Sequence, residues 1–393
     1  MTDTSGQSAL PKSVLVFAPS SFGGIAEHVH YQAAELARRG VTVTVLVRAD
    51  SIKTPPPETY RQLRVLPADH AGRGFGRVMQ VLAAVAGYFV LAGWVLRLRP
   101  DMVLMEANSE YFAPLWAWPH LILSRLVGIP YLANFHDPLR ARHFGPEWLH
   151  RWSITLANAI VWGGLIHGEP PPGAVIPARI KLMIAPLGGF DETARGAVTF
   201  DLRERMAIGA GTFVLLAFGH LADRKNLDLL IKALPQVPGV DLVVAGEATS
   251  GSQRPAQFYR DLAERIGVES RVHFATGFIS DADIPAYFHA ADAVALTYNR
   301  EFVSQSGVLQ HAVDWSKPIL ASSGSGPLRE TVERQGLGVF VEPDDADALV
   351  DGLRTLLRDR PPEENFLRYR DSANWSVNVD RLLDLYHKVV AAR

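Results

Sequence analysis

Residues 300–318, with the letters REFVSQSGVLQHAVDWSKP, place short polar side chains at the start of a predicted helix. Residues 304–306 precede Gly307, and Val308 begins a run of apolar residues spaced to bury one side of that helix. The first amides of a helix have no intrahelical partners and carry a partial positive charge, which suits phosphate oxygens. We therefore expect the amides of Ser306 and Gly307 to bind phosphate, and the alternative is an ordinary capped helix.

A second loop, GHLADRKNLD, places Arg224 and Lys225 just before another predicted helix. Basic side chains beside free helix amides suit a diphosphate, because both neutralise the charge on phosphate oxygens. The alternative is a pair of cations on an ordinary surface loop. If the loop does bind a diphosphate, these side chains can stabilise the charge that grows on a leaving group.

Two loops in the N-terminal half of the chain carry residues that could bind a ligand or transfer a proton. In PSSFGGIAEH, Gly23 and Gly24 lead straight into a helix, so their backbone could approach a phosphate or a sugar. The pattern is not GxGxxG, and a tight turn without a ligand is the alternative. In NFHDP, His136 and Asp137 could position or move a proton near neutral pH, although a solvated turn explains this pair equally well.

Other acidic and histidine clusters resemble metal ligands but fit helix starts better. The DAD triplet at 281–283 opens an apolar helix, and Asp344, Asp345 and Asp347 precede another, so we expect these residues to act as helix caps. The EHVH segment at 27–30 lacks the spacing of HExxH. Cysteine is absent, which excludes disulfides and thiolate chemistry. We therefore expect no metal site.

Alternating strands and helices must position these loops. Such alternation requires parallel sheets covered by helices on both faces, and ligands then lie beyond the carboxyl ends of the strands. The pattern occurs twice, and residues 188–201, which have no apolar period and contain turn formers, separate the two series. We expect strands at 13–19, 41–47, 101–107, 129–135, 159–161 and 181–187, and then at 213–219, 241–246, 272–277, 293–298 and 318–322.

Length and composition agree with two globular domains. A chain of 393 residues exceeds the size at which one core stops growing, and 48% hydrophobic residues can fill large cores. The formal net charge of −2 argues against a general nucleic-acid binder. The first dozen residues lack the basic start and apolar middle of a secretory signal, so we expect a cytoplasmic protein.

One segment, residues 78–96, carries no charge and is long enough to approach a membrane span. Strands are expected on both sides of it in one sheet, which favours a buried crossover helix over a span. A face that lies on the membrane surface is a further alternative, with nearby arginines and an aromatic segment at 111–123 as possible lipid contacts.

Together these motifs resemble the retaining glycosyltransferases of the GT-B fold, of the group-1, family-4 type. The resemblance covers nearly the whole chain, from FGGIAEHVHYQAAELARRGVTVTVL and IPYLANFHDP to FGHLADRKNLDLLIKAL, SGVLQHAVDWSKPILAS and GLGVFVEPDDADAL. It implies two doubly wound Rossmann-like α/β domains facing each other across a cleft. Residues 1–190 would bind the acceptor, 191–200 would form a linker, 201–372 would bind a nucleotide-sugar, and 373–393 would cross back to the first domain.

The sequence departs from the family pattern at the donor site. Members commonly carry two glutamates eight positions apart, and here those positions are Val303 and His311. A subgroup carries QSGV at this place, and this chain resembles that subgroup; Glu301 is a candidate substitute for the first glutamate. The arginine of the GRxxxxK pattern is His220 here, while Lys225 is kept.

By the resemblance, the chain transfers a sugar from a nucleotide-diphosphate-sugar to a glycan, lipid-linked or small-molecule acceptor with retention of configuration. It would act in polysaccharide or glycoconjugate biosynthesis in a bacterium, without metal or cofactor and without nucleic acid, in the cytoplasm or at the inner face of the cell membrane. The expected catalytic residues are His136, Lys225 and Asp137; the expected donor-binding residues are Gly23, Gly24, Gly219, His220, Arg224, Lys225, Gly246, Glu247, Phe278, Glu301, Ser304, Gln305, Ser306, Gly307 and Val308.

Three other functions stay open at this point. One is a related GT-B enzyme such as a nucleotide-sugar epimerase or a phosphorylase. Another is a catalytically silent subunit that binds a glycan or a nucleotide, since both motif glutamates are missing. A nicotinamide-dependent enzyme is disfavoured, because no GxGxxG follows the first strand.

Overall fold

The computed structural model describes residues 10–20, 23–51, 59–68, 75–106, 111–136, 146–171, 173–174, 176–189, 196–248 and 253–392. The chain divides into two compact units. One consists of Met1–Gly188 with Trp375–Arg393, and the other of Gly189–Asn374. The predicted boundaries at 190 and 373 lie close to this division, and half of the predicted linker, residues 191–195, falls outside the described residues.

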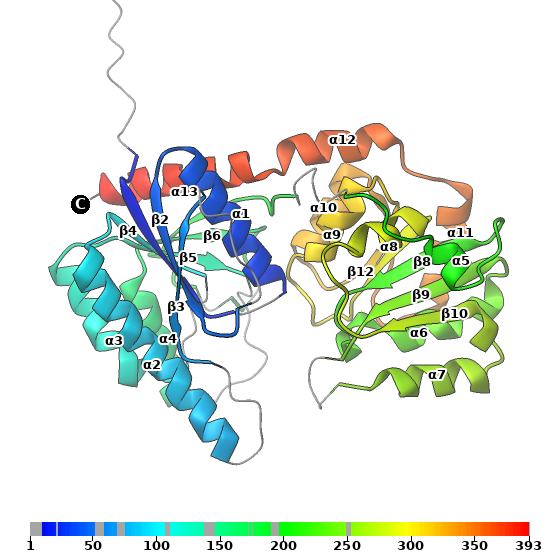
Figure 1. Ribbon diagram of the computed structural model, residues 1–393, viewed down its shortest axis with the longest axis horizontal. Helices are drawn as coiled ribbons and strands as arrows, with labels where there is room; N and C mark the ends of the chain where they lie inside the picture. Colours follow the sequence, from blue (N-terminus) through cyan, green and yellow to red (C-terminus); the bar gives the residue numbers. More distant parts are fainter. Residues whose placement is uncertain are drawn as a thin grey trace, which may run out of the picture. The chain divides into compact units, whose positions relative to one another are not determined.

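The N-terminal unit is built on a seven-stranded parallel sheet with the order β3-β2-β1-β4-β5-β6-β7 (Figure 1). Its central strands are nearly continuous apolar runs, as expected where helices cover both faces. Their bounds are β1 Ser13–Ala18, β2 Thr42–Arg48, β3 Arg61–Leu66, β4 Met102–Met105, β5 Tyr131–Phe135, β6 Gly163–Ile166 and β7 Lys181–Ile184.

Helices cover the two faces of this sheet in separate groups. α1 (Gly24–Arg38) and the C-terminal helix α13 (Trp375–Val390) pack on one face. The other face is covered by α2 (Phe75–Leu98), α3 (Ala113–Leu121) and α4 (Glu147–Ile160). The expected return of the C-terminus to the first domain is therefore confirmed, because α13 contributes Val379 and Leu382 to the core of this unit.

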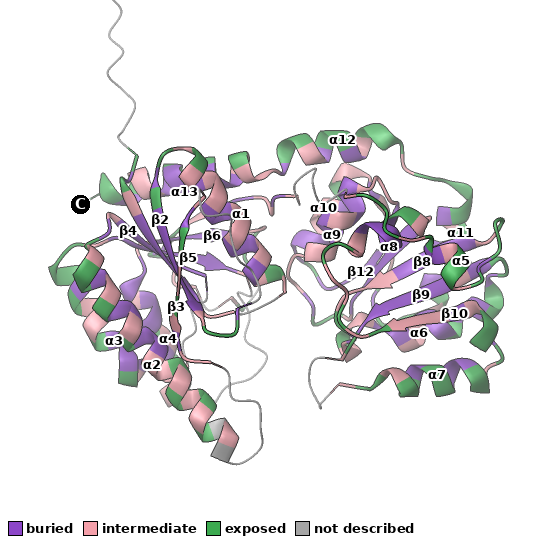
Figure 2. Ribbon diagram, viewed as in Figure 1, coloured by how far each residue is buried: buried purple, intermediate pink, exposed green. Residues whose placement is uncertain are grey.

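The C-terminal unit contains a six-stranded parallel sheet with the order β10-β9-β8-β11-β12-β13. Figure 2 shows buried strands beneath helices that are exposed on their outer sides. The strands are β8 Phe213–Phe218, β9 Val240–Gly246, β10 Val272–Thr276, β11 Ala293–Thr297, β12 Ile319–Ser322 and β13 Gly338–Phe340. The helices are α5 Leu202–Arg205, α6 Leu227–Ala233, α7 Ala256–Arg265, α8 Ile284–Ala290, α9 Gly307–Asp314, α10 Pro327–Gln335, α11 Ala346–Arg358 and α12 Glu363–Ser372.

One predicted strand is wrong. Residues 159–161 end helix α4, and the strand of that series is β6, which starts at Gly163. Two glycines are poor strand formers in general, but here they are required by packing. A side chain at Gly164 would overlap the ring of Phe135, and one at Gly163 would lie 2.9 Å from Leu385 of α13. The edge strands β3 and β13 were not predicted.

The apolar segment at 78–96 is a helix, as predicted, and it connects two strands of one sheet. It is long and apolar enough to cross a membrane by length and composition, yet only 28% of its most apolar window is buried. The prediction of a buried crossover helix is therefore correct in connectivity but incomplete in burial. Leu91 and Val95 are buried, whereas Leu82, Phe89 and Leu96 are exposed.

Candidate functional site

Lys225 lies where the carboxyl end of β8 meets the start of α9. Its ammonium group donates a hydrogen bond to the carbonyl oxygen of Phe218 at 2.7 Å. A Cβ atom placed on Gly219 would lie 3.4 Å from the Lys225 nitrogen and 3.7 Å from Val308. The positive φ of Gly219, +86°, favours glycine, so backbone, ammonium group and helix start come together here.

The backbone around Lys225 is fixed from two sides. Thr297, at the end of β11, donates its hydroxyl hydrogen bond to the Lys225 carbonyl oxygen at 2.9 Å, and the amide of Asn299 donates to the Arg224 carbonyl oxygen at 2.7 Å. Burial, and next the charge of Arg224, lower the pKa of Lys225 to about 7. An anion beside Lys225 would favour its charged form, so this amine is suited to a phosphate group.

Helix α9 begins at Gly307, as predicted, with Ser306 as its N-cap residue. The amide of Ser306 donates to the side-chain oxygen of Gln305 at 3.0 Å, and the side-chain amide of Gln305 donates to Thr331 of α10 at 3.1 Å. The Ser306 amide thus already has a partner in this structure, and phosphate binding by this amide stays a prediction. Gln305 holds the helix start, and the amides of Gly307 and Val308 are the helix donors left for a ligand.

Two glycines and an aspartate hold the loop that precedes α9. A side chain at Gly324 would overlap the carbonyl oxygen of Arg300, and one at Gly326 would lie 2.6 Å from that of Val303. The carboxylate of Asp344 accepts hydrogen bonds from the Arg300 amide at 3.0 Å and from Asn226, the residue after Lys225, at 2.9 Å. Asp344 thus ties the loop before α9 to the loop that carries Lys225.

The remaining predicted donor residues differ in how close they come to Lys225. Gly246 is required by packing, because a side chain there would overlap the Gly219 carbonyl oxygen. His220 and Glu247 are exposed at the ends of β8 and β9. Partial loss of water around the imidazole, and next the charge of Lys225, lower the pKa of His220. The structure brings six predicted donor residues to one edge of the sheet: Gly219, His220, Arg224, Lys225, Gly307 and Val308. Phe278 and Glu301 are exposed, and among the described residues no hydrogen bond joins them to that group.

Arg224 is exposed, and its guanidinium group lies 5.4 Å from the ring of Phe302. That ring stacks on Tyr298 at 3.8 Å, and the Tyr298 hydroxyl is 2.9 Å from the Ser306 hydroxyl. The aromatic pair therefore links the arginine to the start of α9. Val303 and His311 stand at the glutamate positions of the family; His311 packs against the ring of Phe288.

Of the acidic clusters expected to cap helices, one does and one does not. Asp345 accepts hydrogen bonds from the amides of Asp347 and Ala348, which confirms its capping role. Asp283 stands at the N-cap position of α8, but its side chain makes no cap hydrogen bond. It instead accepts hydrogen bonds from Ser280 and Thr199, so it joins the segment before α5 to this loop.

The N-terminal unit holds a second group of polar residues, which we call the histidine cluster: His28, Glu106, His136 and His167. They come from α1 and from the carboxyl ends of β4, β5 and β6. One oxygen of Glu106, Oε2, lies 3.1 Å from His28 Nδ1 and 3.1 Å from His136 Nε2. His136 Nδ1 lies 3.3 Å from His167 Nε2, and His167 Nδ1 lies 3.1 Å from the Ala185 carbonyl oxygen.

The charge state of the cluster follows from its burial. Burial alone would raise the pKa of Glu106, but the charges and hydrogen bonds of His28 and His136 lower it to about 2, so this carboxyl group is ionised. Burial lowers the pKa of His28, and burial with the two neighbouring histidines lowers the pKa of His167 to about 3. His167 is therefore neutral near pH 7.

A chain of buried amides joins Glu106 to the C-terminal helix. Asn134 donates to Glu106 at 2.6 Å and to Gln32 at 2.9 Å, Gln32 donates to Asn378 of α13 at 2.7 Å, and Asn378 donates to the Pro186 carbonyl oxygen at 2.8 Å. Since unpaired polar groups are costly when buried, this chain fixes the place of α13 on the unit.

The other predicted residues of this unit are Gly23, Gly24 and Asp137. Gly23 is the N-cap of α1 with φ +78°, a conformation that favours glycine, and a Cβ atom on Gly24 would meet nothing within 4 Å. Backbone close to a ligand is thus sterically allowed there. Asp137 lies outside the described residues, so its predicted role stays a prediction.

Sequence reasoning missed several residues of both groups. Glu106 and His167 follow β4 and β6, so the rule that ligands lie beyond strand ends points to both. His167 was missed because the strand before it was placed at 159–161. Asn226, and the role of Asp344, were missed because both residues act through hydrogen bonds between loops, and no local pattern predicts such pairs.

Comparisons with known proteins agree with this geometry. Residues 199–372 match the family Glycosyl transferases group 1, and residues 23–162 match the Glycosyl transferase 4-like domain. Sucrose-phosphate synthase from Thermosynechococcus elongatus has a similar structure, with a TM-score of 0.71, 18% identity, and coverage of 97% of this chain and 100% of that chain. HepE from Anabaena, solved in complex with UDP-glucose, gives a TM-score of 0.65 at 19% identity, with coverage of 97% and 98%.

Among curated relatives, D-inositol 3-phosphate glycosyltransferase from Mycobacterium marinum is 27% identical over 222 residues, which are 54% of this chain and 46% of the relative. The chain spans about half the length of the first curated relatives that it matches. The two parallel sheets and the similar solved structures show the GT-B fold. The C-terminal unit is similar to the group 1 glycosyltransferases, and the N-terminal unit is similar to the glycosyltransferase 4-like domains.

Proposed function

We propose that the chain transfers a sugar from a nucleotide-diphosphate-sugar to an acceptor with retention of anomeric configuration, in polysaccharide or glycoconjugate biosynthesis. One observation carries this proposal. The Lys225 ammonium group and Val308, in the first turn of α9, both lie within 4 Å of the place where a Cβ atom of residue 219 would stand, so a cation and the start of a helix come together where a diphosphate can approach.

The transfer needs stabilisation of the charge that develops on the leaving diphosphate. Lys225 and the amides of Gly307 and Val308 supply it, and Arg224 adds a second positive charge from the exposed side of the loop. Because cationic side chains and amides perform this task, the reaction requires no divalent cation. The bond between the anomeric carbon and the diphosphate breaks, and the departing phosphate oxygen accepts the proton of the attacking acceptor hydroxyl.

His136 is our choice for the residue nearest the reacting sugar. Its Nε2 lies 3.1 Å from the ionised Glu106, so this nitrogen carries a hydrogen and the ring is held in one orientation. In this position His136 either polarises a sugar hydroxyl or stabilises the oxocarbenium-like state through its backbone carbonyl oxygen. Glu106 acts through His136 and is a positioning residue.

The nucleotide is tested by a thermal-shift screen of the full chain against UDP, GDP, ADP and their sugars. A ligand that binds only the native state at 100 times its Kd raises the free energy of unfolding by about 2.7 kcal/mol. The HepE complex with UDP-glucose makes uridine nucleotides the first to test. With NAD added to the screen, we expect one nucleotide diphosphate and its sugar to raise Tm; stabilisation by NAD alone would contradict the proposal.

A catalytically silent subunit is the second candidate, because Val303 and His311 replace the motif glutamates. It would bind the same nucleotides as an enzyme does, so binding alone does not separate the two. Incubation of the stabilising nucleotide-sugar with a panel of glycan and lipid-linked acceptors does separate them. Nucleoside diphosphate release supports the transferase, and donor that stays intact with every acceptor supports the silent subunit.

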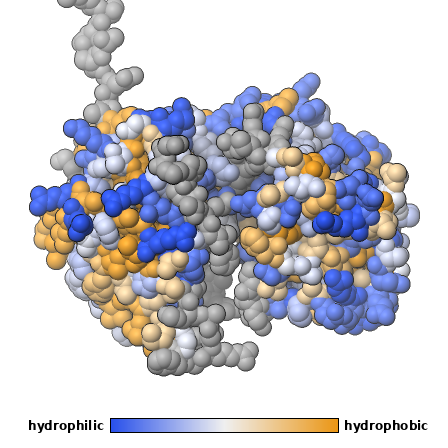
Figure 3. Space-filling model, viewed as in Figure 1, coloured by the Kyte–Doolittle hydropathy of each residue, from blue (hydrophilic) through white to orange (hydrophobic). Residues whose placement is uncertain are grey.

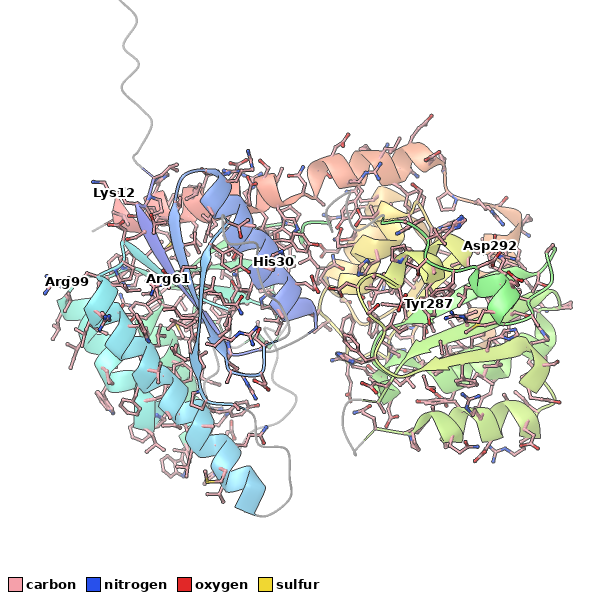
Figure 4. The ribbon with its side chains drawn as sticks, viewed as in Figure 1. Lys12, His30, Arg61, Arg99, Tyr287 and Asp292 are labelled. Atoms are coloured by element: carbon pink, nitrogen blue, oxygen red, sulfur yellow. The ribbon has the colours of Figure 1, made fainter. Side chains whose placement is uncertain are left out.

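We further propose that the N-terminal unit binds a membrane surface and takes a lipid-linked acceptor there. Helices α2, α3 and α4 pack on one face of the sheet, and Figure 3 shows extensive hydrophobic surface on this unit. Arg97 and Arg99 are exposed at the end of α2, and Figure 4 shows Arg99 directed outward, so the helix ends in positive charge suited to acidic lipids. The exposed apolar residues are Val78, Leu82, Phe89, Leu96, Leu115, Trp118, Ile122, Leu126, Val127, Trp148 and Trp152.

A further inference from the structure

The hydrogen bonds of the histidine cluster determine which ring nitrogens carry hydrogen. His28 Nδ1 and His136 Nε2 each lie 3.1 Å from the same carboxylate oxygen of Glu106, and His167 Nδ1 lies 3.1 Å from the Ala185 carbonyl oxygen; carboxylate and carbonyl oxygens accept hydrogen bonds. Each of these nitrogens is therefore the N–H of its ring. In a neutral ring the other nitrogen then carries a lone pair.

These lone pairs converge. His136 Nδ1 and His167 Nε2 are 3.3 Å apart, so two acceptors face each other when both rings are neutral. His28 Nε2 is buried and has no hydrogen-bond partner among the described residues. One ring nitrogen of each of the three histidines lies within 4.8 Å of the others. Three imidazole nitrogens in such a small space are a ligand set that a cation can bind.

The geometry points to a site for Zn²⁺ or a similar divalent transition metal, formed by His28, His136 and His167. Nitrogens that bind tetrahedral Zn²⁺ at about 2.0–2.1 Å lie roughly 3.4 Å from each other, and the His136–His167 distance of 3.3 Å fits this value. Imidazole favours zinc, nickel and copper, whereas Mg²⁺ favours oxygen ligands. The site would leave a fourth position open.

The surroundings match what a metal needs beyond its direct ligands. Histidines that bind metals usually donate their other N–H to a carboxylate or a carbonyl group, which fixes each ring. Glu106 does this for His28 and His136, and the Ala185 carbonyl oxygen does it for His167. The ring of Trp375 packs against His28 at 5.0 Å and covers the cluster from the C-terminal helix.

This site differs from the expectation that the chain holds no metal. The expectation considered histidines close in sequence, whereas these ligands come from three separate elements. His30 illustrates the difference, because it lies two residues from His28, which is about 200° around α1, and its Nδ1 lies 2.9 Å from the Tyr60 hydroxyl. Metal binding itself does not depend on the proposed function. The effect of the metal on activity does rest on the proposed function. A metal bound to His136 Nδ1 would hold the ring next to the reacting sugar and would inhibit transfer.

The test is calorimetric titration of ZnCl₂ into the full chain after treatment with EDTA and dialysis. We expect one strong site, and we expect Co²⁺ to give the visible absorption of a tetrahedral nitrogen-bound ion. His28→Asn and His167→Asn should each weaken Zn²⁺ binding by at least ~100-fold, because asparagine can keep the hydrogen bond to Glu106 or Ala185 but lacks the ligating nitrogen. Glu106→Gln should weaken it by about 10–100-fold.

His30→Asn is the matched control, with the same substitution on the same helix outside the cluster, and it should bind Zn²⁺ as the wild type does. Far-UV circular dichroism and thermal melting establish that each variant is folded. Wild-type chain without a strong Zn²⁺ site would overturn the proposal, and so would folded His28→Asn and His167→Asn variants that bind as tightly as the wild type. In either case a proton shared by His136 and His167 explains their contact. Nucleotide binding at Lys225, measured in the same preparations, separates failure of this proposal from failure of the proposed transferase.

Discussion

The ammonium group of Lys225 donates a hydrogen bond to the carbonyl oxygen of Phe218, at 2.7 Å, in the last residue of strand β8. This bond turns the side chain back toward the sheet edge, where Gly219 and Val308 approach it. A diphosphate can take the place of the carbonyl oxygen as the acceptor. In the proposed donor site of the C-terminal unit, the Lys225 amine would therefore exchange the Phe218 carbonyl oxygen for a phosphate oxygen.

Replacement of Lys225 by alanine tests this assignment. Removal of one preorganised donor that stabilises developing charge costs about 100-fold or more in turnover. Lys225→Ala should therefore lower kcat by at least ~100-fold and weaken binding of the nucleotide diphosphate. Lys232→Ala is the control, because Lys232 is an exposed lysine of α6 that pairs only with the nearby Asp228 at 3.3 Å among the described residues. Equal activities of the two variants would refute a role for Lys225.

Proton uptake on nucleotide binding is a second consequence of the same amine. Burial and Arg224 lower the pKa of Lys225 to about 7, so at pH 8 the amine of the free protein is mostly neutral. A bound diphosphate favours the ammonium form, and binding should then take up a proton and weaken as pH rises from 7 to 9. Titration calorimetry in two buffers of different ionisation enthalpy measures this uptake. Identical heats in both buffers would contradict it.

The lowered pKa of Lys225 also makes the free energy of unfolding depend on pH. The unfolded chain has a lysine pKa of about 10.4, so between pH 7 and that value the unfolded state binds more protons than the folded state. The contribution of Lys225 to the free energy of unfolding therefore increases with pH across this window. Lys225→Ala should lack this increase, which denaturant titrations at several pH values can measure against the Lys232→Ala control.

We also expect sugar transfer to be insensitive to chelators. Because Lys225, Arg224 and helix amides neutralise the leaving group, excess EDTA should leave the rate of sugar transfer unchanged or should raise it if Zn²⁺ occupies the histidine cluster. The initial rate before and after EDTA treatment is the measurement. Loss of activity that Mn²⁺ restores would show that a metal carries the phosphate charge.

Flotation with liposomes tests the membrane surface. Leu126, at the end of the helical segment after α3, is 80% exposed and lies among the apolar residues of that face, so Leu126→Glu should weaken binding to acidic liposomes at low salt. Leu357→Glu applies the same change to a 38% exposed leucine of α11 in the C-terminal unit and should float as the wild type does. Wild-type protein that stays at the bottom of the gradient at low salt would remove the membrane proposal.

The sequence predicts local features of both units well. The start of α9 and the position of Lys225 follow from patterns within a few residues, where capping and strand ends leave clear signals. The histidine cluster does not follow from local patterns, because its members lie on four elements that the strand order of the sheet brings together. The misplacement of β6 shows the same difficulty, because Gly163 and Gly164 are explained by Leu385 and Phe135, which lie far away in the sequence.

Burial was harder to predict than secondary structure. Helix α2 reads as a core helix because it is apolar all round, yet Leu82 and Phe89 are exposed. Hydrogen bonds between side chains and the backbone also could not be predicted from the sequence, as the Ser306 amide shows. Its use by Gln305 depends on where Thr331 of α10 holds that side chain, and no pattern within residues 304–307 carries this information.

The central claim is that the start of α9 and Lys225 hold the diphosphate of the donor, and Gly307→Val tests it most directly. A Cβ atom at Gly307 meets no atom within 4 Å, so valine fits the free protein and fills the space that a phosphate would use. Gly211→Val, also at a position with nothing within 4 Å, is the matched control in the same unit. Calorimetry of each folded variant with the nucleoside diphosphate and with the nucleoside alone is the measurement. We predict that Gly307→Val weakens diphosphate binding and leaves nucleoside binding nearly unchanged, whereas equal losses for both ligands, or no loss for either, would contradict the account.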